Sequence, residues 1–204
     1  NGYILAEAKK GLRGSKIRFP SISVGATENV IIAACLAKGT TYLKNCACEP
    51  EIKNLTNFLK NMGAKITWLK RREIKIVGIK KFKQVSHSIM FDRIEAGTFI
   101  IAAALAGKKI KICGLDVKIL KTEIKILKKM GVSLKISKNE IQVLKSKNIK
   151  PIFIKTEPYP GFPTDLQAQI MVLMTRAKGI SRIRENIFEN RFMHVPELNR
   201  MGAK

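Results

Sequence analysis

Two short segments of the chain combine residue types that could hold an anion or move a proton. Residues 23–27 (SVGAT) precede an apolar, helix-like stretch, so their backbone N–H groups and the positive end of the helix dipole favour an anion. Gly25 would allow such a ligand to approach the backbone closely. Asp165 lies at the start of another helical stretch, where a carboxylate is also favoured. Each segment has an equally simple structural interpretation, a helix N-terminus capped by Ser23 or Thr27, or by Asp165.

The four cysteines do not form a pattern typical of metal binding. Their spacing lacks the paired ligands of a zinc site, and the chain has only two histidines. We therefore expect structural free thiols and no metal ion. The cysteines are Cys35, Cys46, Cys48 and Cys113.

Composition favours a globular, cytoplasmic protein with a basic surface. The chain has 204 residues, 46% of them hydrophobic, and no apolar run long enough to span a membrane. Its formal net charge of +24 also fits a basic nucleic-acid-binding module, because lysine and arginine neutralise phosphates. The lysines are spread thinly with few aromatic residues between them, which favours a solvated surface that attracts small polyanions. The nucleic-acid alternative stays open.

The elements that would position these segments form a repeat. Three times the chain shows a small-residue turn, an apolar helix ending at a glycine, a short strand and an amphipathic surface helix. The turns are 25–27, 96–98 and 162–164, and the apolar helices are 30–37, 99–106 and 170–177, followed by Gly39, Gly107 and Gly179. The strands are 41–44, 109–112 and 181–184, and the surface helices are 55–62, 120–130 and 195–201. Paired strands follow in the first two copies, at 65–69 with 73–77 and at 133–136 with 140–144.

The three apolar helices predict the architecture. A helix that is apolar all round has to be enclosed on every side. We therefore expect an α/β fold in which buried apolar helices lie inside and sheets lie outside.

Five segments carry a resemblance to a known family. They are residues 23–29 (SVGATEN), 49–52 (EPEI), 92–98 (DRIEAGT), 160–169 (PGFPTDLQAQ) and 187–194 (IFENRFMH). Together they resemble the enolpyruvyl transferase family, and within it the enzymes that act on UDP-N-acetylglucosamine. The last two segments are too long and too unusual in composition for a chance match. The resemblance implies the family's inside-out α/β barrel, with three βαβαββ-type repeats of the family's six.

The resemblance also implies a domain organisation. Residues 1–90 would be the C-terminal part of one domain, and residues 91–204 the first, truncated part of a second, with a hinge near Phe91 and Asp92. The chain starts at Asn1 and stops just after a helical segment. We therefore expect a fragment that lacks the family's catalytic cysteine loop and C-terminal part. Such a fragment would need the missing halves of its two domains as partners, and alone it would be inactive.

The reaction implied by the resemblance is the first committed step of peptidoglycan synthesis. The enolpyruvyl group of phosphoenolpyruvate would be transferred to the 3-hydroxyl of UDP-N-acetylglucosamine, with no metal or organic cofactor. The shikimate-pathway enzyme of the same family is the alternative.

The family's site residues carry over to specific positions. By resemblance, Ser23, Val24 and Gly25 hold the diphosphate, and Asp165 binds the attacking hydroxyl as the candidate general base. The backbone of Ile187 and the side chain of Phe188 would hold the sugar. Five further charged residues of the motifs are expected to form ion pairs at the hinge and cleft: Glu49, Glu51, Asp92, Arg93 and Arg191.

Overall fold

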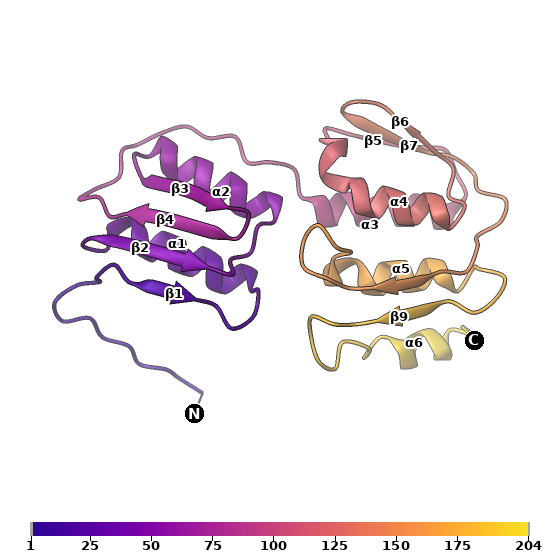
Figure 1. The fold of residues 1–204 in the computed structure, drawn as a ribbon. Helices are drawn as coiled ribbons and strands as arrows, with labels where there is room; N and C mark the ends of the chain where they lie inside the picture. Colours follow the sequence, from indigo (N-terminus) through magenta and orange to yellow (C-terminus); the bar gives the residue numbers. More distant parts are fainter. Residues whose placement is uncertain (1, 204) are drawn as a thin grey trace. The chain divides into compact units, whose positions relative to one another are not determined.

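The computed structural model describes residues 2–203, which form two compact units divided between Met90 and Phe91 (Figure 1). Each unit combines helices with β-sheet, so the predicted α/β class is confirmed. Among the described residues, no helix has the length and hydropathy needed to cross a bilayer.

The first unit is a four-stranded sheet with two helices on one face (Figure 1). Its strands are ordered β1-β2-β4-β3, with β1 parallel to β2 and the other neighbours antiparallel. Its elements are β1 (Lys16–Arg18), α1 (Val24–Leu36), β2 (Thr40–Lys44), α2 (Pro50–Asn61), β3 (Lys65–Lys70) and β4 (Glu73–Val77). Leu43, Ile74 and Ile76 of the central strands are buried with Ile31 of α1 and Ile52 of α2. Burying each such side chain stabilises the unit by about 1.5–3 kcal/mol.

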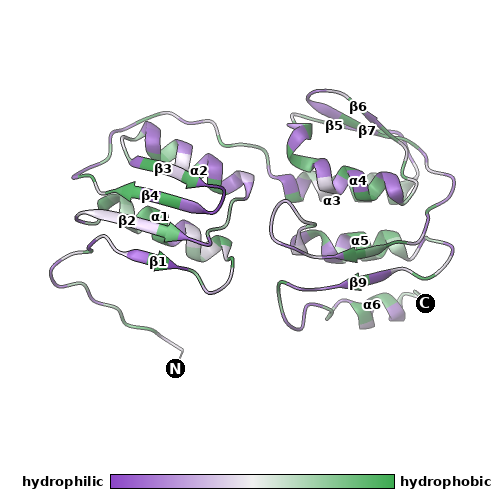
Figure 2. Ribbon diagram, in the orientation of Figure 1, coloured by the Kyte–Doolittle hydropathy of each residue, from purple (hydrophilic) through white to green (hydrophobic). Residues whose placement is uncertain are grey.

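The second unit contains a three-stranded antiparallel sheet, ordered β5-β7-β6, and a parallel pair of strands, β8 and β9. Hydrophilic and hydrophobic residues alternate along its helix α4 (Figure 2), and Ile124 and Leu127 of that helix are buried, as expected for a surface helix. The three-stranded sheet and its helices are formed by α3 (Arg93–Ala106), β5 (Ile110–Cys113), η1 (Val117–Leu120), α4 (Lys121–Lys129), β6 (Leu134–Ile136) and β7 (Glu140–Val143). They are followed by β8 (Phe153–Lys155), η2 (Thr164–Leu166), α5 (Gln167–Met174), β9 (Arg182–Arg184) and α6 (Val195–Arg200).

The predicted strand pairs are present, but two further strands, β1 and β8, were not predicted. β3 pairs with β4 and β6 with β7, both antiparallel as expected. Strands β1 and β8 have three residues each, and each forms a parallel pair with a strand much later in the chain, β2 or β9. The chain between the partners contains α1 or α5, so each unit holds a β-α-β crossover. The inside-out barrel and the number of repeats stay predictions.

Two of the three predicted small-residue turns are wrong, because α1 and α3 begin earlier than expected. The side-chain oxygen of Ser23 accepts a hydrogen bond from a first-turn N–H of α1 at 3.2 Å. The carboxylate of Asp92 accepts two from α3, at 2.7 and 3.1 Å. With these N-caps in place, residues 25–27 and 96–98 lie inside the helices rather than before them.

The predicted glycine caps are confirmed at only one of three helices. Gly107 ends α3 in the left-handed conformation, with φ of 64°. Helix α1 ends instead at Ala37, an extended residue, and α5 ends at Thr175. Gly39 and Gly179 do have positive φ, but they belong to the connections that follow these helices.

The prediction that the apolar helices are enclosed on every side is also wrong for the described residues. Ile32 and Leu36 of α1 and Phe99 of α3 are about half exposed. Helix α1 packs against β4 and α2 of its own unit, and α3 against α5 and the β5–β7 strands, so each helix buries one side only.

Gly97 marks a close approach between α3 and the segment that carries Asp165. A Cβ at position 97 would lie 2.5 Å from Cδ1 of Leu166, whose side chain is fully buried. Protein interiors are closely packed, so the added atom has to be accommodated by shifts of its neighbours. We expect Gly97→Ala to lower the free energy of unfolding by about 1–3 kcal/mol, although alanine is the better helix former. Urea unfolding followed by circular dichroism measures this. Gly25→Ala in α1, where an added Cβ meets nothing within 4 Å, is the control, and equal stabilities of the two variants would contradict the prediction.

Candidate functional site

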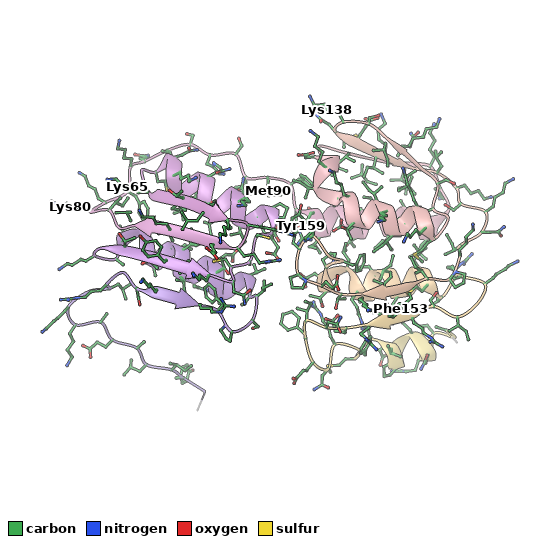
Figure 3. The ribbon with its side chains drawn as sticks, in the orientation of Figure 1. Lys65, Lys80, Met90, Lys138, Phe153 and Tyr159 are labelled. Atoms are coloured by element: carbon green, nitrogen blue, oxygen red, sulfur yellow. The ribbon has the colours of Figure 1, made fainter. Side chains whose placement is uncertain are left out.

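The carboxyl ends of strands β8 and β9 organise the candidate site of the second unit. The strands are parallel, so both carboxyl ends lie at the same edge, which is where open α/β sheets bind ligands. Lys155 pairs with Arg184 at the last register position, and Thr156 and Glu185 follow them side by side. The hydroxyl of Thr156 donates a hydrogen bond to Glu185 at 2.7 Å. In Figure 3, the label Phe153 marks β8 at the start of this region.

Glu185 accepts hydrogen bonds from four groups of three chain segments. Its Oε1 accepts from the hydroxyl of Thr156 and from the N–H groups of Ile187 and Phe188, the last two at 2.8 and 3.2 Å. Its Oε2 accepts from the hydroxyl of Thr164 at 2.9 Å. Burial raises the pKa of this carboxyl, but the four hydrogen bonds outweigh burial and hold the pKa below its usual range. Glu185 was not predicted, because its only signal in the sequence is a glutamate two residues before a predicted site residue.

Asp165 lies in η2 and forms an ion pair with Arg191. The Asp165 Oδ1 to Arg191 Nη2 distance is 2.7 Å, and the Arg191 Nη1 donates to the hydroxyl of Thr164 at 2.8 Å. The ion pair predicted for Arg191 is therefore confirmed. The interpretation of Asp165 as a plain helix cap is wrong, because Pro163 and Leu166 occupy the N-cap positions of η2 and α5. The carboxylate of Asp165 stays half exposed, so it can meet a ligand from solution.

The structure brings three of the predicted site residues into one group. Asp165 is connected through Arg191 and Thr164 to Glu185, which in turn binds the backbone of Ile187 and Phe188. The ring of Phe188 is exposed and its centroid lies 5.2 Å from the guanidinium carbon of Arg191. A carboxylate, a backbone segment and an aromatic face thus lie together, which suits a polar ligand with hydroxyl groups and an apolar face.

The other predicted site residues belong to the first unit, at the start of α1. Ser23 is the N-cap, and the hydroxyl of Thr27 donates to the Ser23 carbonyl at 2.7 Å and accepts from the N–H of Ala47 at 3.0 Å. The capped-helix interpretation is therefore confirmed. The N–H groups of Val24 and Gly25 lie in the first turn of α1, where a helix offers no carbonyl to accept from them, and Gly25 is exposed. Such a helix start favours an anion.

The capping bond of Ser23 leads to a measurable expectation. Ser23→Ala removes the acceptor for a first-turn N–H, and we expect the free energy of unfolding to fall by about 1 kcal/mol. Thermal unfolding compared with Ser23→Asp, which restores a capping oxygen, checks this. If the alanine and aspartate variants melt at the same temperature as the unmodified protein, the capping bond contributes nothing.

Three glutamates gather near this helix start. The pKa of Glu28 is raised, first by burial and then by the charges of Glu51 and Glu49. Like charges held together in this way favour the neutral form of one member.

The remaining charged residues of the motifs have different roles. Arg93 and Glu123 form a buried ion pair, with 3.7 Å between Nη1 and Oε1, so an ion pair of Arg93 is confirmed, while its place at the hinge and cleft stays a prediction. Asp92 acts as the N-cap of α3. The ion pairs expected for Glu49 and Glu51 stay predictions.

The four cysteines are free thiols, as predicted. Cys35, Cys46 and Cys48 are buried, and Cys113 lies exposed on β5. Burial raises the pKa of Cys35 and of Cys46 to about 11, so these two thiols are poor nucleophiles at neutral pH.

Comparison with known proteins finds similar sequences along the whole chain. The family model described as EPSP synthase (3-phosphoshikimate 1-carboxyvinyltransferase) matches residues 1–204. A curated protein of Pelagibacter ubique, named UDP-N-acetylglucosamine 1-carboxyvinyltransferase, is 62% identical over 100% of this chain and 49% of its own length. A protein of the same name from Bartonella tribocorum is 48% identical over 100% of this chain and 48% of its own length. The chain therefore spans about half the length of these relatives.

Solved structures agree in fold. The enolpyruvyl transferase NikO from Streptomyces tendae superposes with a TM-score of 0.78 at 27% identity, covering 86% of this chain and 42% of NikO. An EPSP synthase from Acinetobacter baumannii gives a TM-score of 0.63 at 20% identity, covering 94% and 46%. The second likeness shows the fold alone.

Proposed function

Because the chain belongs to the family of EPSP synthase (3-phosphoshikimate 1-carboxyvinyltransferase), we propose that the protein carrying it is an enolpyruvyl transferase acting on UDP-N-acetylglucosamine. The observation that carries the choice of substrate is the 62% identity to a UDP-N-acetylglucosamine 1-carboxyvinyltransferase over the whole chain. The reaction would be the first committed step of peptidoglycan synthesis, and so would serve cell-wall formation, cell shape and cell division. We place it in the cytoplasm, where phosphoenolpyruvate is made.

The proposed reaction transfers protons and an enolpyruvyl group and needs no oxidant or reductant. The sugar 3-hydroxyl adds to the central carbon of phosphoenolpyruvate and loses its proton, and a proton joins the methylene carbon. The resulting tetrahedral intermediate then loses phosphate, and the carbon–carbon double bond forms again as the methyl group gives up a proton. No bound metal or organic cofactor takes part in the proposed steps.

Each predicted site residue has a role in this reaction. Asp165 would accept the hydrogen bond of the attacking hydroxyl and take its proton, and its half-exposed carboxylate, held by Arg191 at 2.7 Å, supports this role. Ile187 and Phe188 would hold the sugar. Ser23, through its helix cap, and the N–H groups of Val24 and Gly25 would hold the diphosphate. The units 1–90 and 91–204 would be the end of one family domain and the beginning of the next.

A substrate competition tests the proposal. In a chimera, this chain replaces the matching segment of the Pelagibacter ubique relative, so that the protein has the full length of the family. We expect phosphate release from phosphoenolpyruvate only when UDP-N-acetylglucosamine is present, with shikimate 3-phosphate unable to replace it. Turnover with shikimate 3-phosphate would support the shikimate-pathway alternative. A folded chimera that releases no phosphate with either of the two acceptor substrates would contradict both functions.

One observation favours the second candidate function, nucleic-acid binding. Lysines of η1, α4 and the β6–β7 connection line a groove of about 980 Å³, so positive charge is more concentrated here than the sequence suggested. They are Lys118, Lys121, Lys125, Lys128, Lys129 and Lys138. The lining residues include no aromatic side chain on which a base could stack. Duplex DNA binding that weakens steeply between 50 and 200 mM salt, as is typical of phosphate neutralisation, would support this function.

A further inference from the structure

Glu185 connects two chain segments that the proposed function assigns to one substrate. Its Oε1 binds the N–H groups of Ile187 and Phe188, and its Oε2 binds the hydroxyl of Thr164, next to Asp165. We propose that Glu185 is the positioning residue that holds η2, which contains Asp165, and the Ile187–Phe188 segment in one geometry. The sugar hydroxyl and the rest of the sugar are then oriented together. The inference rests on the proposed function.

The carboxylate is suited to this task because all of its partners are donors. Three groups donate to Oε1 and one donates to Oε2. Hydrogen bonds to an ionised acceptor are roughly twice as strong as those between neutral groups. A glutamine in the same place would present an NH₂ group to one set of these donors, so at least one contact would be lost.

Thr156 fixes one end of the hydrogen-bond network around Glu185. Thr156 is fully buried, and its hydroxyl donates to Glu185 while accepting from the N–H of Asn186 at 2.9 Å. The Glu185 side chain is therefore fixed between the ends of β8 and β9. A residue with this support can transmit a defined position to its other partners.

The network continues from Glu185 to the candidate base. The Thr164 hydroxyl that donates to Glu185 accepts from Arg191 at 2.8 Å, and Arg191 binds the Oδ1 of Asp165 at 2.7 Å. A residue that only capped its own loop would need no bond to Thr164, which lies 21 residues earlier in the chain. The bond between these distant segments is what distinguishes positioning of the site from local loop closure.

The test compares two ligands that differ by the sugar. Calorimetry on the full-length chimera gives dissociation constants for UDP-N-acetylglucosamine and for UDP, whose diphosphate is assigned to residues 23–25 of the other unit. For Glu185→Gln we expect binding of the nucleotide sugar to weaken by about tenfold to hundredfold, with UDP binding unchanged. The matched control is Glu197→Gln, which removes an exposed carboxylate paired with Arg200 and should alter neither constant.

The outcomes separate this inference from its premise. If the unmodified chimera binds no UDP-N-acetylglucosamine, the proposed function fails and the inference fails with it. If the unmodified chimera binds and Glu185→Gln weakens both ligands equally, or neither, the positioning role is overturned while the function stands. Should Glu185→Gln not fold, Thr156→Val removes one anchor of the same carboxylate and Thr156→Ser keeps it. A selective loss of sugar binding in the valine variant, rescued by serine, supports the inference, and equal affinities of the two variants contradict it.

Discussion

Replacing Asp165 by asparagine should lower the turnover of the full-length chimera by about 10²- to 10⁴-fold, and affect nucleotide-sugar affinity far less. Asparagine keeps the shape of the side chain and can still accept a hydrogen bond from Arg191 or a hydroxyl, but it cannot take a proton. The expected loss corresponds to roughly 3–5 kcal/mol of transition-state stabilisation. The ion pair with Arg191 is partly exposed, so its weakening should cost only about 0–1 kcal/mol of folding stability.

Steady-state kinetics with both substrates saturating, together with a melting curve, separates these effects. Asp116→Asn is the matched control, because Asp116 caps η1 through the N–H of Lys118 and asparagine is an equally good cap. Its turnover should match that of the unmodified protein. An Asp165→Asn enzyme within about threefold of the unmodified turnover would remove Asp165 from the catalytic residues.

Replacing Arg93 by methionine should destabilise the protein by about 3–5 kcal/mol. This is the largest stability effect that we expect from the loss of one buried charged side chain. Arg93 and Glu123 are 8% and 4% exposed, so the substitution leaves a carboxylate in the interior without this guanidinium. The desolvation of that carboxylate, more than the loss of attraction, sets the cost. Arg93 starts α3 and Glu123 lies in α4, so the contact between these two helices should loosen first.

The comparison pair for this prediction is Arg200 and Glu197 of α6. Their distance is shorter, 3.1 Å against 3.7 Å, but their side chains are 77% and 63% exposed. Arg200→Met should therefore cost no more than about 1 kcal/mol. Chemical unfolding of both variants measures the difference. The double variant Arg93→Met with Glu123→Leu should recover most of the lost stability, because neither buried charge of the pair remains. A double variant as unstable as Arg93→Met alone would show that desolvation is not the cause.

The sequence alone determined the elements whose signals are local. The hairpin strands β3–β4 and β6–β7 alternate apolar and polar residues over short distances, and the amphipathic spacing of α4 indicates one buried side. The motifs at 160–169 and 187–194 were sufficient to indicate the family that the comparisons show. These patterns can be recognised in the sequence because every residue that forms them lies within a few positions of the next.

Only the tertiary structure decided the features that depend on distant partners. Strands β1 and β8 are three residues long, and each forms only because β2 or β9, more than 20 residues later, supplies its hydrogen-bond partners. Glu185 is an ordinary glutamate in the sequence, and its role appears when the parallel pair sets it beside Thr156 and opposite Thr164. A charged side chain acquires its function from the donors around it. The hydroxyls of Thr164 and Thr156 lie 21 and 29 positions away in the chain, so no pattern of neighbouring residues could predict these two donors.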